Sequence, residues 1–523
     1  MPSSSRMDRL TRAGMQALVR GGLKGLEKES LRLTTGGRIA QTPHPAALGS
    51  ALTHPWITTD YSEALIELIT PPSQNPEDVL RFMSEIHAFV HQHLADELLL
   101  ATSMPIGLDG DESIPIARYG HSNIGQMKHI YRRGLSYRYG RTMQSIAGVH
   151  FNYSANESLW PVLQELEEHR GQLSAFVADA YFGVIRNVHR YGWLLIYLFG
   201  NSPAICKSFF RGRESFASRF VELDADTLYR AKATSLRMSD IGYRNDNQTS
   251  LDISVNAIQE YIASLEAAIN QPYPEYQSIG VKVDGEYRQL NANILQIENE
   301  YYSLIRPKQV TLSGEKPTLA LKKRGVRYVE LRALDLLCMQ PAGISLDELR
   351  FLETFVIFCL LHESPSLDHD EKAECNRNSL NVACCARGKG FTLFRKGKPL
   401  PLKQWGSEIL DELLPIADVL DQGDIGQPYR NSVEKQRSAV CDPEQTLSAM
   451  VLDEMRSNQE SFAEFALRLS QQHANHWRQC VLDGETEREF IRESEQSREK
   501  QAQIEAQDTL SLDEFLQRYW TQS

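Results

Sequence analysis

The stretch LEKESLRL, residues 26–33, places an acidic side chain on alternate residues. In a β-strand, residues two apart lie on the same face, so Glu27 and Glu29 would project together. Lys28 and Ser30 would point to the opposite face. Two neighbouring carboxylates repel each other, and the repulsion grows in a partly dry site unless a cation offsets it. The stretch therefore predicts a strand with an acidic face.

Three later segments alternate in the same way and predict three further strands. They are YSEALIELIT at residues 61–70, IAGVHFNYS at residues 146–154 and VRYVELRAL at residues 326–334. The polar residues that would share a face within each strand are, in chain order, Tyr61, Glu63 and Glu67; His150 and Asn152; and Tyr328, Glu330 and Arg332. Asp60 directly precedes the first of these segments. Each predicted strand thus offers one apolar face and one face with functional groups.

The order of the predicted elements indicates the fold class. Long helical stretches at residues 77–100 and 163–189 interrupt the strands without strict β–α alternation. This order favours an α+β fold with a largely antiparallel sheet over a parallel, doubly wound sheet. We expect residues 1–523 to form a single large catalytic domain. Its core sheet and active site would occupy about residues 20–340, and about residues 341–523 would be a mostly helical elaboration.

Composition excludes several classes of protein. Hydrophobic residues make up 41% and charged residues 24%, which excludes collagen-like, coiled-coil and wholly disordered chains. The net charge of −12 argues against a nucleic-acid partner. Without an apolar run of about 18 residues, we expect no membrane span. Eight cysteines without CxxC or zinc-ligand spacing predict reduced thiols in a cytoplasmic protein. The terminal residues 481–523, which include the charged segment 484–507, predict a solvated tail outside every motif.

If the polar faces of the four strands converge, their carboxylates need cations. Oxygen ligands with a single imidazole suit Mg²⁺, or alternatively Mn²⁺, better than Zn²⁺. The alternative is an ordinary solvated sheet face. Magnesium usually accompanies a nucleotide phosphate, yet the sequence has no GxxxxGK[ST] motif. A nucleotide would therefore be held through metal ions and sheet residues.

The polar, glycine-punctuated segment ATSLRMSDIGY, residues 233–243, contains Arg237. A guanidinium there could grip a carboxylate through two parallel hydrogen bonds. An ordinary surface salt bridge is the alternative for this arginine.

Seven segments together resemble the proteobacterial glutamate-cysteine ligase family, also called γ-glutamylcysteine synthetase. They are LEKES at 26–30, ALGSALTHPWITTDYSEALIELITP at 47–71, MQSIAGVHFNYS at 143–154, GNSPAIC at 200–206, ATSLRMSDIGY at 233–243, LQIENEYYSLIRP at 295–307 and YVELRALD at 328–335. The segments follow the order and compatible spacing of the family. The resemblance covers residues 20–340 well and the following part loosely.

The resemblance implies the first step of glutathione biosynthesis. ATP would phosphorylate the side-chain carboxylate of L-glutamate, and the amine of L-cysteine would attack the γ-glutamyl phosphate to give γ-glutamylcysteine, ADP and phosphate. It also implies a glutamine-synthetase-like fold, in which a curved antiparallel sheet forms a funnel with helices packed behind. Feedback inhibition by glutathione is a further implication, and we expect a cytoplasmic monomer.

The resemblance also implies roles for individual residues. The metal ligands would be Glu27, Glu29, Asp60, Glu67, His150 and Glu330. Arg332 would stabilise the transferring phosphoryl group, and Arg237, with the backbone of Ile146 and Gly148, would bind glutamate. The cysteine pocket would comprise Tyr61, Tyr131, Leu135, Tyr243 and Tyr302. Position 61 is commonly Phe in the family, so the Tyr61 hydroxyl is expected to affect the choice of amine. No adenine contact is predicted, because the family match beyond residue 341 is loose.

Two other functions fit the same residues. One keeps the fold and the glutamyl phosphate but joins a different amine. The other is a non-catalytic binding protein whose acidic face is solvated or holds structural calcium.

Overall fold

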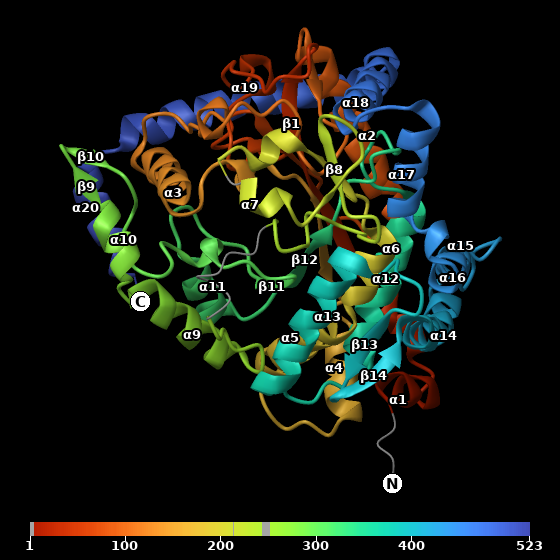
Figure 1. Cartoon of the computed structure of the whole chain (residues 1–523). Coiled ribbons are helices and arrows are strands. Elements are labelled where there is room, and N and C mark those ends of the chain that lie inside the picture. The colour runs from red at the N-terminus through yellow and green to blue at the C-terminus, as the bar shows by residue number, and fades with distance from the viewer. Residues whose placement is uncertain (1–4, 213, 243–250, 523) are drawn as a thin grey trace.

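A computed structural model of the chain describes residues 5–212, 214–242 and 251–522 (Figure 1). Within these residues, seven strands form one sheet in the order β11-β12-β5-β1-β3-β2, and β4 pairs with β1. Their bounds are β1 Leu23–Thr34, β2 Ile57–Thr59, β3 Leu65–Ile69, β4 Glu97–Leu99, β5 Val149–Ser154, β11 Ile305–Lys308 and β12 Tyr328–Leu334. Every ladder of this sheet is antiparallel. The predicted α+β class with a mainly antiparallel sheet is therefore confirmed.

The register of the sheet brings the alternating acidic residues together. Glu27 on β1 lies opposite His150 on β5, and Glu29 on β1 lies opposite Glu67 on β3. Glu330 on β12 lies opposite Asn152, which is two residues beyond His150 on β5. Because residues two apart share a face, these side chains all project from one side of the sheet.

The strand predicted at residues 61–70 begins only at Leu65, so the predicted position of Glu63 is wrong. Residues 61–64 form a turn, which closes where the Leu65 N–H donates to the Ser62 carbonyl. Glu63 therefore points away from the other acids, and its carboxylate accepts the backbone N–H groups of His44 and Arg118 at 2.8 and 2.7 Å.

Among the described residues, the helices that contact the strands of the sheet include α2 Pro76–His93, α5 Leu173–Tyr191, α6 Trp193–Phe199 and α12 Leu346–Leu361, and α18 Phe462–Gln479 packs on β4. α12 is buried along almost its whole length. It is tied to β1 by a buried ion pair in which Lys24 Nζ lies 2.6 Å from Glu353 Oε1. The other Glu353 oxygen accepts the Tyr429 hydroxyl at 2.7 Å. A buried charge is tolerated when it is paired in this way, so the pair anchors the sheet to its helices.

Two predicted helices have different bounds. The predicted helix 77–100 ends at His93, because Ala95 has a left-handed φ of 49° and residues 97–99 form β4. The predicted helix 163–189 is two helices, α4 Leu159–Leu166 and α5, with Glu168 at a left-handed φ of 53° between them. Non-glycine residues rarely adopt a positive φ, and one such residue interrupts a helix.

The remaining helices surround this core. They are α1 Arg6–Arg12, α3 Asn123–Tyr139, α7 Glu214–Ala217, α9 Ile258–Asn270, α10 Pro274–Ile279, α11 Pro317–Arg324, α13 His369–Cys385, α14 Leu402–Leu420, α15 Pro428–Glu434, α16 Gln436–Cys441, α17 Leu447–Asn458, α19 Gly484–Gln507 and α20 Leu512–Trp520. Small sheets are formed by β6 Ala204–Cys206 with β8 Thr227–Tyr229 and β7 Val221–Glu222, by β9 Lys282–Val283 with β10 Glu286–Tyr287, and by β13 Thr392–Arg395 with β14 Lys398–Pro401. Among the described residues, no helix is long and apolar enough to span a membrane.

The charged segment 484–507 is largely exposed, as predicted, but it is a helix that docks on the rest of the fold through one side. It forms α19, the dark blue helix across the top of Figure 1. Phe490 is 1% exposed and packs edge-on against Trp56 and Phe82, with ring centroids 5.7 and 5.6 Å apart. Further along, Ser497 Oγ accepts the Ser50 N–H at 2.9 Å. One apolar side chain and a few polar contacts thus hold a helix of charged composition against the N-terminal part of the chain.

We expect Phe490→Ala to destabilise the protein by about 3–5 kcal/mol, because it removes a fully buried aromatic side chain. The matched control is Ile491→Ala, since Ile491 is 41% exposed on the same helix. Thermal unfolding of both variants gives the comparison. Equal and small losses in the two variants would mean that α19 is not held by Phe490.

Candidate active site

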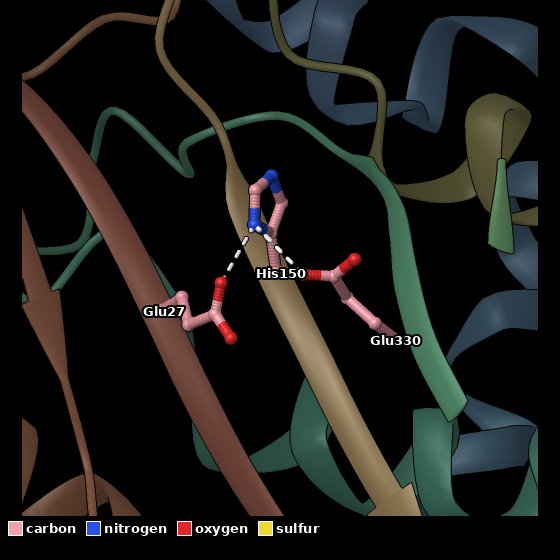
Figure 2. Close-up of side chains that lie close together, drawn as sticks. All are labelled: Glu27, His150 and Glu330. Carbon is pink, nitrogen blue, oxygen red and sulfur yellow. Dashed lines mark hydrogen bonds and ion pairs between the residues drawn. The ribbon is translucent and has the colours of Figure 1, made fainter. Parts of the chain in front are cut away.

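Four carboxylates on the polar face of the sheet surround His150, and we call these five residues the acid face: Glu27, Glu29, Glu67, His150 and Glu330. His150 Nδ1 lies 3.1 Å from Glu27 Oε2 and 3.8 Å from Glu330 Oε1 (Figure 2). On the other side of the ring, His150 Nε2 lies 3.7 Å from Glu29 Oε1. The antiparallel register of four strands thus places the imidazole among carboxylates.

Two sets of three residues on the acid face could each hold a metal ion. Glu27, His150 and Glu330 form one set, and Glu29, Glu67 and His150 form the other. Within each set the ligand atoms lie within 4.8 Å of one another. Carboxylate oxygens with one imidazole nitrogen are a donor set that suits Mg²⁺ or Mn²⁺.

Carboxylate crowding perturbs the titration of the acid face. Desolvation, and then the charges of Glu27 and Asp60, raise the pKa of Glu67 well above its usual range. Desolvation also raises the pKa of Glu29, against the lowering effect of His150. A bound cation would remove this repulsion and favour the ionised carboxylates, so the residues present fit a divalent metal.

Two cations offset the charge of Glu330. Lys308 Nζ lies 3.0 Å from Glu330 Oε1, and Arg332 Nη1 lies 3.3 Å from Glu330 Oε2. Desolvation opposes ionisation of Glu330, but these two charges lower its pKa well below the usual range. Arg332 Nη1 is also 3.5 Å from His150 Nδ1, so its guanidinium borders the acid face.

Asp60 lies next to the acid face but belongs to neither set of three ligands. Its backbone carbonyl accepts a hydrogen bond from the Tyr119 hydroxyl at 2.9 Å and another from Arg132 Nε. With Glu29, Asp60 lines an adjoining cavity. The two carboxylates thus connect the acid face to this cavity.

The adjoining cavity has an aromatic wall, and we call it the aromatic cavity. It is lined by Tyr61, Tyr131, Leu135 and Tyr302 from the predicted cysteine pocket, together with Glu29, Asp60, Arg132, Tyr139, Met143, Gln144, Asn299, Glu300, Arg306 and Arg332. The structure therefore brings four of the five predicted residues together. Tyr243, the fifth, lies outside the described residues.

Arg237 and Gly148 pack directly against each other beside the acid face. Arg237 is 1% exposed, and its Nη2 donates to the Arg332 carbonyl at 3.0 Å. A Cβ atom added to Gly148 would come within 2.3 Å of the Arg237 guanidinium, so only glycine leaves room for it. The Gly148 N–H in turn donates to Glu29 at 2.8 Å. Ile146, two residues earlier, is fully buried. The predicted glutamate-binding residues thus adjoin the predicted metal ligands.

A larger cavity of about 700 Å³ adjoins the aromatic cavity and shares Tyr131, Arg132 and Asn299 with it. Its walls come from α3, residues 311–315, α19 and α20. Lys128 lines it, and desolvation followed by the charge of Arg132 lowers the Lys128 pKa to about 8. The C-terminal helices therefore border the approach to the aromatic cavity, which corrects the expectation that residues 484–507 lie apart from every motif.

Sequence reasoning missed several charged and polar residues of this region. Lys308 follows Arg306 at a spacing of two, so the alternation on β11 was a usable signal for both. Asn152 was predicted to share a face with His150 but was given no role, and it donates to Glu27 Oε1 at 2.8 Å. Arg132 comes from helix α3, and the only signal for it was its place beside Tyr131 of the predicted cysteine pocket.

The sequence of this chain is similar to those of known proteins over most of its length. A family model described as glutamate-cysteine ligase matches residues 7–382. A glutamate–cysteine ligase of Azotobacter vinelandii is 49% identical over 519 residues, which covers 99% of this chain and 97% of that protein. One of Pseudomonas putida is 48% identical over 502 residues, covering 96% and 95% of the two chains.

Two solved structures are similar to the whole chain. That of a glutamate–cysteine ligase from Francisella tularensis in complex with AMP has a TM-score of 0.90 and 35% identity, and covers 96% of this chain and 98% of that one. That of a bifunctional glutathione synthetase from Pasteurella multocida has a TM-score of 0.71 and 26% identity, covering 91% of this chain and 55% of that one.

The fold, the acid face and these likenesses define an enzyme of the carbon–nitrogen ligase class. The chain belongs to the glutamate–cysteine ligase family, which acts at the first step of glutathione synthesis. The family predicted from the sequence motifs is thereby confirmed.

We expect Glu330→Gln to weaken binding of Mn²⁺ by about 10–100-fold, because it removes one charged ligand of the first set. Titration of the purified protein with Mn²⁺, followed by electron paramagnetic resonance, measures this directly. Glu63→Gln is the matched control, since Glu63 is a carboxylate of the same segment as Glu67 that points elsewhere. Unchanged Mn²⁺ binding in Glu330→Gln would exclude Glu330 as a ligand.

Proposed function

We propose that this chain joins the γ-carboxylate of L-glutamate to the amine of L-cysteine, with ATP and Mg²⁺, through a γ-glutamyl phosphate. One observation carries the proposal: the acid face adjoins both the Arg237–Gly148 pair and the aromatic cavity. A phosphate, an amino-acid carboxylate and a small amine could therefore meet at one point. The names of the relatives and the AMP complex of the Francisella structure support the choice of substrates.

The acid-face residues would hold the metal ions. When bound, Mg²⁺ neutralises phosphate charge and orients the phosphates of ATP. Asn152 and the Gly148 N–H hold the Glu27 and Glu29 carboxylates by hydrogen bonds of 2.8 Å each. These contacts fix the carboxylates in place, as outer partners of metal ligands do. Asp60 is the additional carboxylate at the boundary with the aromatic cavity.

Arg332 is well placed to stabilise the transferring phosphoryl group. Its guanidinium contacts Glu330, borders the acid face and lines the aromatic cavity. It would therefore lie between the phosphate donor and the attacking amine. A fixed positive charge at this point stabilises the negative charge that develops on the phosphoryl oxygens and on the acyl phosphate.

Glutamate and cysteine would bind on two sides of the acid face. Arg237 presents a guanidinium to the glutamate α-carboxylate, with the backbone of Ile146 and Gly148 beside it. The aromatic cavity would enclose the small side chain of cysteine, and its shape limits the size of the amine. The Tyr61 side chain is 2% exposed in this wall, where a hydroxyl can influence selectivity between cysteine and close analogues.

We further propose that the chain works as a single catalytic unit, because helices α3, α19 and α20 together wall the cavity that leads to the aromatic cavity. Residues far apart in sequence would thus serve one site.

Release of ADP tests the proposed reaction. With Mg²⁺, ATP and glutamate present, we expect cysteine to give the highest kcat/KM in a series that includes serine, alanine and 2-aminobutyrate. A carboxylate–amine ligase with a different acceptor would prefer another amine. If cysteine gives no advantage over the other amines, the proposed substrate is wrong.

We expect Arg332→Ala to lower kcat by about 10²–10³, the usual effect of losing one preorganised electrostatic contact. Far-ultraviolet circular dichroism and thermal unfolding check that the fold is kept. Arg133→Ala, which removes an exposed ion pair to Glu286 on the outer side of α3, is the control and should leave turnover unchanged. Near-normal turnover in Arg332→Ala would place Arg332 outside the reaction.

A further inference from the structure

Asp335 directly follows β12 and is buried, with 1% of its surface exposed. It lines neither the aromatic cavity nor the larger cavity beside it. Its Oδ2 accepts the Asn201 N–H at 2.8 Å and the Ser202 hydroxyl at 2.6 Å. Its Oδ1 accepts the Ser235 hydroxyl at 2.8 Å. Burial of a carboxylate is unfavourable unless hydrogen bonds offset the desolvation, and three donors do so here. The role of this network in the fold therefore needs an explanation.

The three donors come from two motifs: GNSPAIC at residues 200–206, which has no assigned role, and the start of ATSLRMSDIGY at residues 233–243, which carries Arg237. Asp335 is itself the last residue of a third motif, YVELRALD. The first two segments also bind each other, since the Leu236 N–H donates to the Ser202 carbonyl at 2.7 Å. Three separate motifs therefore meet at one carboxylate.

These contacts hold the backbone on both sides of Arg237. Ser235 Oγ, which donates to Asp335, accepts the Met238 N–H at 3.1 Å. Ser202 Oγ, which also donates to Asp335, lies 3.4 Å from the Arg237 N–H. A substitution at Asp335 would thus shift the backbone on both sides of Arg237.

β12 also holds the side chain of Arg237. The Arg237 guanidinium donates to the carbonyl of Arg332, three residues before Asp335 on the chain, and packs on Gly148. The strand therefore fixes Arg237 at two points: the guanidinium through a backbone carbonyl and the backbone through Asp335. These two contacts would hold the Arg237 guanidinium in a single orientation, as binding a substrate carboxylate requires.

We propose that Asp335 is a positioning residue for glutamate, which acts by fixing the Arg237 guanidinium toward the substrate α-carboxylate. The proposal rests on the proposed function, in which Arg237 binds that carboxylate. Asp335 does not touch substrate; it acts through Ser202 and Ser235 on the segment that carries Arg237.

A purely electrostatic role for Asp335 predicts the opposite effect. Desolvation raises the pKa of Asp335, and the nearby positive charge of Arg237 acts against this rise. If only the charge of Asp335 mattered, its removal would leave Arg237 more attractive to an anion and would lower the KM for glutamate. A positioning role predicts that the KM for glutamate rises.

Steady-state kinetics of Asp335→Ala and Asp335→Asn test the proposal. We expect Asp335→Ala to raise the KM for glutamate by about tenfold, the effect of a weakened charge-assisted contact, with the KM values for ATP and cysteine within about twofold. Asp335→Asn keeps an oxygen for two of the three donors and should have a smaller effect in the same direction. If Asp335→Ala does not fold, Asp335→Asn and Ser235→Ala carry the test, because each removes only part of the network.

The link to Arg237 is tested by a double-mutant cycle. In an Arg237→Ala background, the effect of the Asp335 substitution on the KM for glutamate should disappear. Glu353→Gln is the matched control: it alters another buried carboxylate, which contacts Lys24 and Tyr429, and should change thermal stability without changing this KM.

The outcomes separate the inference from the function on which it rests. An unchanged or lowered KM for glutamate in the Asp335 variants, or an equal effect in both backgrounds, would overturn the positioning role while leaving the function intact. If Arg237→Ala itself leaves the KM for glutamate unchanged, the proposed role of Arg237 fails, and the positioning role fails with it.

Discussion

Repulsion among carboxylates on one face of a β-sheet is the constraint on which the rest of the structure depends. The antiparallel register places Glu27, Glu29 and Glu67 around His150, and desolvation makes their mutual repulsion strong. Among the acid-face carboxylates, Lys308 and Arg332 contact only Glu330 directly and offset the charge of the others less strongly. A sheet can keep such a face only if the other side is firmly packed and if cations reach the acids when the enzyme works. The buried helices behind the sheet pack its other side firmly. The carboxylate oxygens on the acid face are ligands that divalent cations prefer.

Alternation of residue types predicted the acid face well wherever the chain runs as a straight strand. Glu27, Glu29, His150 and Glu330 all lie on the predicted side, because a period of two leaves no other choice within a strand. The prediction for Glu63 was wrong because a turn precedes β3, and alternation alone does not reveal where a strand begins. The predicted helix 77–100 was too long because its end is set by a non-glycine residue in a left-handed conformation, which has no clear signal in sequence. The helical character of α19 was predicted, but its charged composition concealed the docking of its Phe490, Ser494 and Ser497 side on the fold.

Residues that reach the site from other elements could not be predicted from local pattern. Arg132 on α3 meets Asp60 only because the two segments are packed together, and the same holds for the walls of the larger cavity. Local pattern predicted a divalent metal site but no substrates. The substrates were predicted from the resemblance of whole motifs to a known family. Asp335 lies in one of those motifs, yet its partners are 100 to 134 residues away in sequence, so its role becomes visible only once the chain is folded.

The C-terminal helices pack near α3, so this part of the fold can form only late in biosynthesis. The Asn123 N–H pairs with Asp508, a residue 385 positions later in the chain. At a translation rate of about 5–20 residues per second, roughly 20–80 s separate the synthesis of these two partners. The wall of the larger cavity therefore stays open while most of the protein is still being made on the ribosome. Until Phe490 has been made, Trp56 and Phe82 lack the aromatic ring that packs against both of them in the folded protein, so an unfinished polypeptide would expose more of their apolar surface.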